Sequence, residues 1–367
     1  MKTGNQIRRI LSKWFFCENP FLHRLSVLMI KSACFTYKLG KYPSEQEIGQ
    51  IIERFASTYP QDRKDEFSKD IRRCWMRYGL APDEYFMYHI HERDKKERAA
   101  FISDIDRLAI ASLLNDRTEA KLLVHKYQTY QKYKEFYQRE MILGKQIDPS
   151  FIERHPRFIV KEENGKRGIN IAIEDVSAYA SKDELIIKIK NKDNIVCEEL
   201  IEQNEIMKTL HPQSINTIRV RVLRTMDGDV VIWNCTLRTG RGDSIVDNAY
   251  MGGPSALIDS ENGTVISNGH TESGLVFEKH PDSQIVFKGF RIPEWNELKK
   301  LVAALMEKGN TLGYVGWDLA LSTKGWVVVE GNSFGQVVTP QLVLQKPLKE
   351  ELWNIIYGKD ADNCCRL

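Results

Sequence analysis

The sequence lacks the uncharged apolar run of about 20 residues that a membrane-spanning helix needs. Its most apolar N-terminal stretch, residues 21–37, is interrupted by Arg24 and Lys31, and no signal-peptide cleavage site follows it. A large charge excess is also missing, because 53 basic residues stand against 50 acidic ones in a chain of 367. A nucleic-acid-binding protein usually has a concentrated basic excess. We therefore expect a cytoplasmic protein with no nucleic-acid partner.

Paired cysteine motifs are also missing. The seven cysteines include no C-x-x-C pair, and their number is odd and their spacing irregular. These features exclude a disulfide scaffold and argue against zinc-ribbon and thioredoxin-like sites. We expect free cysteines in a reducing compartment, most of them acting as small buried apolar residues.

Positive charge is concentrated at the N-terminus. Residues 1–41 hold eight lysines and arginines against the single Glu18, which gives 8 − 1 = +7, and aromatic residues lie between the charges. Such a segment can lie on an anionic membrane surface or contact a partner such as a glycosyltransferase. The alternative is an amphipathic helix that packs on its own protein.

The N-terminal third predicts helices, and the rest predicts mainly strands. Ser44 and Glu47 form a capping box ahead of apolar residues at helical spacing, and further helices are expected at 63–79 and 95–113. From about residue 155 the apolar period becomes two. We expect strands at 157–161, 184–190 and 196–201, hairpins at 217–224/229–238 and 312–321/325–330, and a helix at 293–308. Helices and antiparallel strands are segregated, which favours an α+β fold.

The last predicted hairpin carries a group of oxygen ligands. Asp318 lies in its first strand, and Glu330 and Asn332 end the second. Residues two apart on a strand share a face, so Glu330 and Asn332 should point the same way. Three hard oxygen donors suit Mg²⁺, which binds through one or two carboxylates together with substrate phosphates. The alternative is a solvated hairpin end, although acidic groups within such apolar strands are costly unless they are paired or ligated.

Three further patterns would suit an anionic ligand. Lys161 ends a strand before the Gly165–Gly168 loop, and Arg219 enters a strand near Arg221, Arg238 and Arg241. Asn248 precedes Gly252 and Gly253 in a loop that can bring bare amides close to a ligand. Taken singly, each pattern also fits an ordinary loop or surface arginines.

The order of these motifs resembles the sugar-transfer-associated ATP-grasp family, over about residues 105–345. The matching strings are Leu114-Asn115-Asp116, Phe158–Lys161, Glu198–Gln203, Ser214–Arg219, Val246-Asp247-Asn248 with Gly252-Gly253, His280-Pro281, Gly289 with Ile292-Pro293, Gly316-Trp317-Asp318 and Glu330-Gly331-Asn332. The chain is more loosely similar to ligases that append glutamate to protein tails. The resemblance implies two α+β subdomains that grip ATP between antiparallel sheets. It suggests a helical module at 1–104, a catalytic domain at 105–345 with a flexible central part at about 150–205, and a C-terminal helix and tail at 346–367.

The resemblance also implies roles for individual residues. It implies ATP and Mg²⁺, with two ions expected, and it assigns Mg²⁺ to Asp318, Glu330 and Asn332. The other residues it singles out are Lys161, Gly165, Gly168, Glu199, Leu200, Ile201 and Glu205 for the nucleotide, Arg219 and Arg238 for the transferred phosphate, and Asn248, Gly252, Gly253, Arg241 and His280 for the acceptor side.

Two positions depart from the family pattern. The lysine that usually follows the Asn-Asp pair is Arg117 here, so Lys121 becomes the candidate for the second nucleotide-binding lysine. The proline that often follows the strand lysine is Glu162, whose charge weakens the cationic field at the phosphate site unless the side chain points outward, as strand alternation permits.

The expected activity is ligation of a carboxylate to an amine, in bacterial surface-polysaccharide or glycoconjugate assembly. In ATP-grasp ligases the carboxylate takes the γ-phosphate of ATP, and an amine then displaces phosphate from the acyl-phosphate. A phosphotransferase acting on a sugar or similar molecule is one alternative, and a nucleotide-binding scaffold without turnover is another. Such chemistry needs positioning and charge neutralisation rather than a catalytic serine or cysteine nucleophile.

Overall fold

The computed structural model describes residues 21–22, 25–26, 28–29, 43–165, 170–247, 252–356 and 365–366. Most of the basic segment 1–41, with its predicted membrane or partner contact, lies outside these residues. No helix within the described ranges is both long enough and apolar enough to cross a bilayer. Cys74, Cys197 and Cys235 are buried and form no disulfide, as predicted.

Helices and strands follow one another in the α+β pattern predicted from the sequence. The helices are α3 (Glu45–Ala56), α4 (Gln61–Tyr78), α5 (Pro82–Met87), η1 (Ile90–Glu92), α6 (Lys95–Ala100), α7 (Asp104–Leu114), α8 (Arg117–Leu122), α9 (Lys126–Tyr137), η2 (Gly144–Gln146), α10 (Pro149–Arg154), η3 (Val176–Ala178), α11 (Lys182–Lys190), α12 (Glu205–Lys208), α13 (Trp295–Lys308), α14 (Val338–Leu344) and α15 (Lys349–Ile356). The strands are β1 (Met141–Leu143), β2 (Arg157–Glu162), β3 (Ala172–Asp175), β4 (Ile195–Glu199), β5 (Thr217–Arg224), β6 (Val230–Arg238), β7 (Ser255–Ile258), β8 (Gly269–His270), β9 (Val276–Phe277), β10 (Tyr314–Ser322), β11 (Gly325–Asn332) and β12 (Cys365–Arg366).

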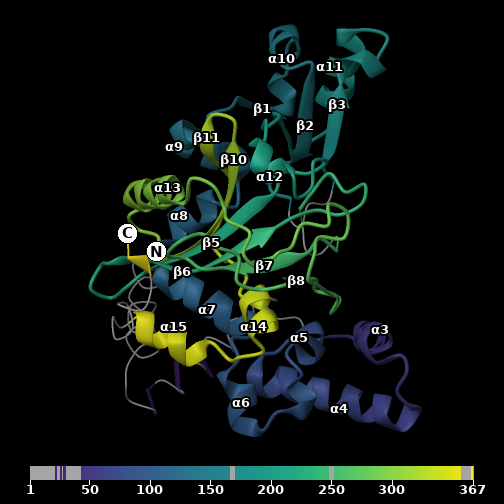
Figure 1. The fold of residues 1–367 in the computed structure, drawn as a ribbon, viewed down its shortest axis with the longest axis vertical. Coiled ribbons are helices and arrows are strands. Elements are labelled where there is room, and N and C mark those ends of the chain that lie inside the picture. The colour runs from purple at the N-terminus through teal and green to yellow at the C-terminus, as the bar shows by residue number, and fades with distance from the viewer. Residues whose placement is uncertain are drawn as a thin grey trace.

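The strands form two antiparallel sheets. The small sheet has the order β1-β4-β2-β3, and the large sheet has the order β11-β10-β5-β6-β7-β8-β9, with β12 paired to β6. Figure 1 shows the small sheet with α10 and α11 at one end of the molecule, the large sheet in the middle, and α3 to α6 at the other end. Both predicted hairpins, β5–β6 and β10–β11, are confirmed.

Each sheet has its own apolar core. One face of the large sheet packs on α9 and α13 through residues such as Val220, Trp317 and Tyr133. The opposite face has an apolar cluster near α7 and α15, where Leu223 and Tyr314 are buried. The same face also carries the charged side chains of the candidate site.

The N-terminal helices form a third core. The predicted capping box is present, with the Glu47 amide donating to Ser44 Oγ over 3.2 Å. These helices share their core with Leu342 of α14, so they pack directly on the C-terminal part of the chain. The segment 95–113, predicted as one helix, forms two helices, because Ser103 caps the N-terminus of the second helix, α7.

The predicted strand at 184–190 is wrong, because this segment is the helix α11. The Ser181 side chain caps it by accepting from the Glu184 amide over 3.2 Å. Leu185 and Ile189 are buried at helical spacing, while Ile187 is 60% exposed. The isoleucines suggested a strand, but the cap and the four-residue spacing of the buried positions decided the structure.

Candidate functional site

The centre of the site is a row of charged residues across three neighbouring strands. Asp318 on β10 lies opposite Arg219 on β5 and opposite Glu330 on β11. Directly opposed residues share a face of the sheet, so these three side chains lie together. Asn332, two residues after Glu330, lies on the same face, as the sequence predicted.

Two β-bulges bring these side chains to one face. The register of β10 and β11 shifts after Asp318, which leaves Val329 without a partner. Strict alternation from the buried Val328 would turn Glu330 into the apolar core, and the extra residue turns it to the face of Asp318 instead. A similar shift leaves Trp233 unpaired on β6 and turns Arg238 to the same face.

Glycines make room for this arrangement. A side chain on Gly331 would meet the ring of Trp317 at 2.6 Å, so only glycine fits between Glu330 and Asn332. At Gly316 a Cβ atom would approach Gly335 and the Arg219 side chain at 3.2 Å.

Asp318 is held by two arginines. Arg219 donates to both carboxylate oxygens, with Nη2 at 2.8 Å from Oδ2, and Arg238 Nη1 donates to Oδ2 over 2.9 Å. Burial by itself would raise the pKa of Asp318, but Arg219 and Arg238 outweigh it and lower that pKa to about 2. Asp318 is therefore a buried anion at neutral pH.

This pKa predicts how stability depends on pH. The folded pKa lies below the value of about 3.9 for an unfolded chain, so the ion pairs stabilise the fold above that pH, and their contribution is lost as pH falls towards 2. We expect the unfolding free energy of the wild type to fall, relative to Asp318→Asn, by about 1 kcal/mol between pH 5 and 3. Urea unfolding of both proteins at several pH values measures this, and a constant difference would contradict it.

Arg238 also holds a second, largely buried carboxylate. Its Nη2 donates to Asp247 Oδ1 over 3.2 Å, and the Thr217 hydroxyl donates to Asp247 Oδ2. Burial raises the pKa of Asp247, and Arg238 opposes that rise. Arg238 therefore joins Asp318 to the residue that immediately precedes Asn248 in the sequence.

The third arginine, Arg221, donates to a carbonyl and to neutral side chains within the part of the chain that the structure describes. It donates to the Gln336 carbonyl and, over 2.8 Å, to Asn234 Oδ1. Burial lowers the pKa of Arg221 to about 10, and the neighbouring charge of Arg219 contributes. Arg221 therefore fixes the segment that follows Asn332.

Two asparagines in the sequence motifs hold the backbone. Asn115 donates to the Tyr314 and Ser333 carbonyls at 2.8 and 2.9 Å and accepts from the Gly313 and Tyr314 amides. Asn216 donates through its side chain to the Met207 carbonyl over 2.9 Å. These motif residues therefore position the strands around the site.

The small sheet contributes Lys161. Its ammonium group pairs with Glu198 of β4, and both side chains are buried. Arg139 pairs with the same carboxylate and donates to the Val328 carbonyl over 2.6 Å, which ties the small sheet to β11. Although burial opposes ionisation, Arg139 and Lys161 lower the pKa of Glu198. Glu162 accepts from Asn170 and is not part of this cluster.

Lys126 is a functional candidate that the sequence reasoning missed. Its Nζ atom lies 3.8 Å from Glu330 Oε1 and donates to the Gly165 carbonyl over 2.7 Å. Burial lowers the pKa of Lys126, and Glu330 opposes that effect. Lys121, the residue expected from sequence, is exposed on α8. The available signal was the position of Lys126 at the start of a helix, which does not by itself predict proximity to Glu330.

The segment predicted to contact adenine connects the two sheets. Glu199 ends β4, and its side chain accepts from the Glu140 amide over 2.9 Å. Leu200 and Ile201 follow, half-buried, before Gln203 pairs with Ser322 of the large sheet. Glu205 is exposed at the start of α12 and lies 3.6 Å from Lys208.

Two predicted site residues lie outside the described residues: Gly168, assigned to the nucleotide, and Asn248, assigned to the acceptor side. Arg241 lies beside Gly252, where a Cβ atom would come within 3.1 Å of Nη2, and Gly253 is buried next to it. His280 is fully buried, with Nε2 2.9 Å from the Gly240 carbonyl and Nδ1 accepting from the Asp282 amide. Its ring therefore joins the backbone at Gly240 to the backbone at Asp282.

The chain belongs to the sugar-transfer associated ATP-grasp family, whose family model matches residues 96–356, more than half of the sequence. This match confirms the family predicted from the motifs and the ATP-grasp fold. The boundaries predicted at 104 and 345 stay predictions. A search of curated proteins found no match.

Several solved structures are similar to this chain at low sequence identity. The ATP-grasp ligase PsnB, complexed with minimal precursor, is 10% identical over 69% of this chain and 69% of its own, with a TM-score of 0.41. N5-carboxyaminoimidazole synthetase from Staphylococcus aureus, complexed with ADP, is 13% identical over 63% of this chain and 52% of its own, with a TM-score of 0.40. D-alanine–D-alanine ligase from Bacillus anthracis, complexed with ATP, is 14% identical over 68% and 66%, with a TM-score of 0.37.

Proposed function

We propose that this protein is an ATP- and Mg²⁺-dependent ligase that joins a carboxylate to an amine through an acyl-phosphate. The observation that carries the proposal is the row of Arg219, Asp318 and Glu330 across three strands, with Lys126 beside Glu330. Family membership adds the ATP-grasp framework for this arrangement. Oxygen donors and cations on one face suit the phosphates of ATP together with a hard metal ion.

The donor set fits Mg²⁺. Asp318 and Glu330 supply carboxylate oxygens from opposed positions, and Asn332 supplies an amide from the same face. Bound there, Mg²⁺ would neutralise charge on the outer phosphates. Arg219 and Arg238 now share the oxygens of Asp318, so they must release part of that contact when the carboxylate takes another partner. The released guanidinium groups are then available to the transferred phosphate.

The reaction has two steps. A substrate carboxylate oxygen attacks the γ-phosphorus, and ADP leaves. The acceptor nitrogen then attacks the acyl carbon, the C–O bond to phosphate breaks, and the nitrogen gives up a proton. In this proposal Arg219, Arg238, Lys126 and Lys161 hold the phosphates, and Asn248, Gly252, Gly253 and Arg241 are on the acceptor side.

Hydroxylamine trapping tests the first step without knowledge of the natural amine. The enzyme is incubated with Mg·ATP, hydroxylamine and candidate carboxylates such as uronic acids and amino acids. We expect ADP, phosphate and a hydroxamate in equal amounts with the correct acid. Phosphorylation of a hydroxyl group with no hydroxamate would identify a phosphotransferase instead. ATP binding without turnover of any carboxylate or hydroxyl substrate would favour a scaffold.

Lys126 and Lys121 offer a matched comparison. The Lys126 side chain is 11% exposed and lies near Glu330, whereas Lys121 is exposed one helix earlier, so equal charge is removed at two different places. A charge-assisted hydrogen bond contributes about 1.5–3 kcal/mol, so Lys126→Met should weaken ATP binding about tenfold or more. Lys121→Met should change it less than about twofold. Calorimetric titration with Mg·ATP measures both, and the opposite ranking would restore Lys121 as the nucleotide-binding lysine.

The pathway proposal rests on the family's association with sugar transfer. We propose a glycan or amino-acid carboxylate as substrate, and contact of residues 1–41 with the inner membrane face or with a glycosyltransferase. Vesicles containing anionic lipid should retain the full chain at low salt and release it at high salt, since screening weakens contacts between exposed charges. Equal retention of a chain that lacks residues 1–41 would contradict the membrane contact.

A further inference from the structure

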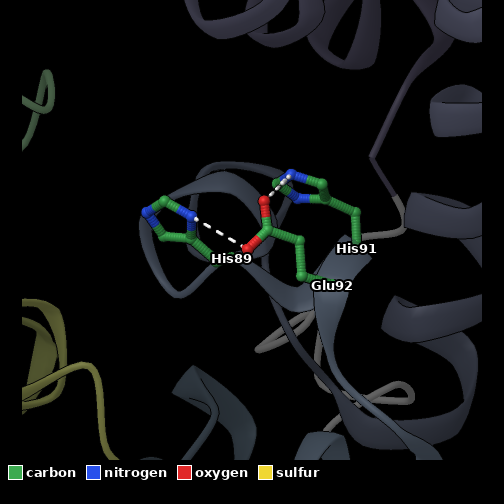
Figure 2. A group of neighbouring side chains, drawn as sticks. All are labelled: His89, His91 and Glu92. Carbon is green, nitrogen blue, oxygen red and sulfur yellow. Dashed lines mark ion pairs between the residues drawn. The ribbon is translucent and has the colours of Figure 1, made fainter.

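A second polar cluster lies far from the sheets, in the N-terminal helices. His89, His91 and Glu92 fall within four consecutive positions, 89–92, at η1. Figure 2 shows the Glu92 carboxylate between the two imidazole rings. One possible ligand atom from each residue lies within 4.8 Å of the others. Two imidazoles and a carboxylate form a donor set found around Zn²⁺.

Each imidazole lies close to a different oxygen of the Glu92 carboxylate. His91 Nε2 lies 3.4 Å from Glu92 Oε1, and His89 Nδ1 lies 3.7 Å from Glu92 Oε2. Ligand bonds of about 2.0–2.1 Å in tetrahedral geometry place donor atoms about 3.3 Å apart. The remaining adjustment falls on His89 and Glu92, whose side chains are 53% and 65% exposed.

The backbone turn at His89 brings the two imidazole rings together. His89 has φ 51° and ψ 40°, in the left-handed region that most side chains avoid. The turn at His89 places its ring 6.0 Å from that of His91, nearly parallel to it.

His91 is fixed in place more firmly than its neighbours. Its ring packs against Phe67, Tyr85 and Phe86, and its Nδ1 atom is buried without a hydrogen-bond partner among the described residues. A ligand site with one fixed and two adjustable donors loses little packing when a metal binds.

Two nearby arginines pair with other carboxylates. Arg98 pairs with Asp70 at 2.9 Å, and Arg63 pairs with Glu66 at 2.6 Å. The Glu92 carboxylate therefore faces mainly the two histidines.

We propose that His89, His91 and Glu92 form a Zn²⁺-type site, with water completing the coordination. The site would fix the turn between α5 and α6. Arg93, the next residue, donates to the Gln345 carbonyl over 2.9 Å just after α14, so a bound ion would stiffen the contact between the N-terminal helices and the C-terminal part.

Titration of the full, tag-free, metal-stripped chain with Zn²⁺ tests this proposal. Excess Mg²⁺ is present to occupy the oxygen-donor site on the large sheet, so the result does not depend on the proposed ligase activity. We expect one equivalent of Zn²⁺ to bind and to raise the melting temperature, because a ligand that binds only the folded state stabilises it. Co²⁺ in place of Zn²⁺ should give the visible absorption of a tetrahedral site.

Variants locate the ion. His89→Ala and Glu92→Gln change exposed side chains and should leave folding intact, while each weakens Zn²⁺ binding at least about tenfold, since loss of even a partner that only hydrogen-bonds a ligand costs about 10–100-fold. His270→Asn, on β8, is the control and should bind like the wild type. Absence of Zn²⁺ binding below millimolar concentration in the wild type, or unchanged binding by both variants, would overturn the proposal.

Discussion

Asp318→Asn should lower ATP-dependent turnover on the order of 10³-fold or more, because Asp318 is the buried anion proposed to bind Mg²⁺ beside the phosphates. The change keeps the size of the side chain. It removes one carboxylate from the proposed Mg²⁺ donors, and it weakens the bonds that position Arg219 and Arg238. Substrate-dependent ADP release measures the loss, alongside the affinity for Mg·ATP.

Stability must be separated from catalysis in this experiment. Asp318 is 4% exposed, and in the variant Arg219 and Arg238 lose the charged carboxylate with which they pair. A melting curve therefore has to accompany the rate measurement. Glu330→Gln is the companion variant. The Glu330 side chain is 35% exposed and its nearest cation, Lys126, is 3.8 Å away, so we expect a comparable loss of turnover with little loss of stability. A variant at Asp318 that folds and turns over normally would contradict the proposed site.

Local sequence pattern predicted the strands of the site but not how they are aligned. The β10–β11 hairpin and the shared face of Glu330 and Asn332 follow from alternation. Alternation alone would have separated Glu330 from Asp318, and the bulge at Val329 is what brings them together. A bulge depends on how two strands pair, so one strand's sequence does not reveal it.

Lys126 and α11 illustrate two other limits. Lys126 reaches Glu330 because α9 begins beside the edge strand β11, which is a tertiary contact between segments about 200 residues apart. In α11, three isoleucines and a leucine favoured a strand by intrinsic preference, while the cap at Ser181 and burial against the small sheet selected a helix. Tertiary packing decided both outcomes.

Arg238→Met should be among the most destabilising substitutions in the chain. Arg238 Nη1 is 2.9 Å from Asp318 Oδ2, and its Nη2 is 3.2 Å from Asp247 Oδ1. Both carboxylates are largely buried, so removing the shared guanidinium leaves two negative charges poorly compensated. Breaking a buried ion pair in this way costs about 3–5 kcal/mol. Denaturant unfolding should show that loss, and turnover should fall with it if Arg238 also holds phosphate.

A second substitution separates the two roles of Arg238. Asp247→Asn removes one of the uncompensated charges and can still accept from the Thr217 hydroxyl. The double variant Arg238→Met/Asp247→Asn should therefore be more stable than Arg238→Met alone, with a coupling energy of about 1–3 kcal/mol in the double-mutant cycle. Turnover should remain low, because neutralising Asp247 restores no cation to the phosphate site. Recovery of activity together with stability would mean that Arg238 serves the fold alone, and additive stabilities would mean that Arg238 and Asp247 are not coupled.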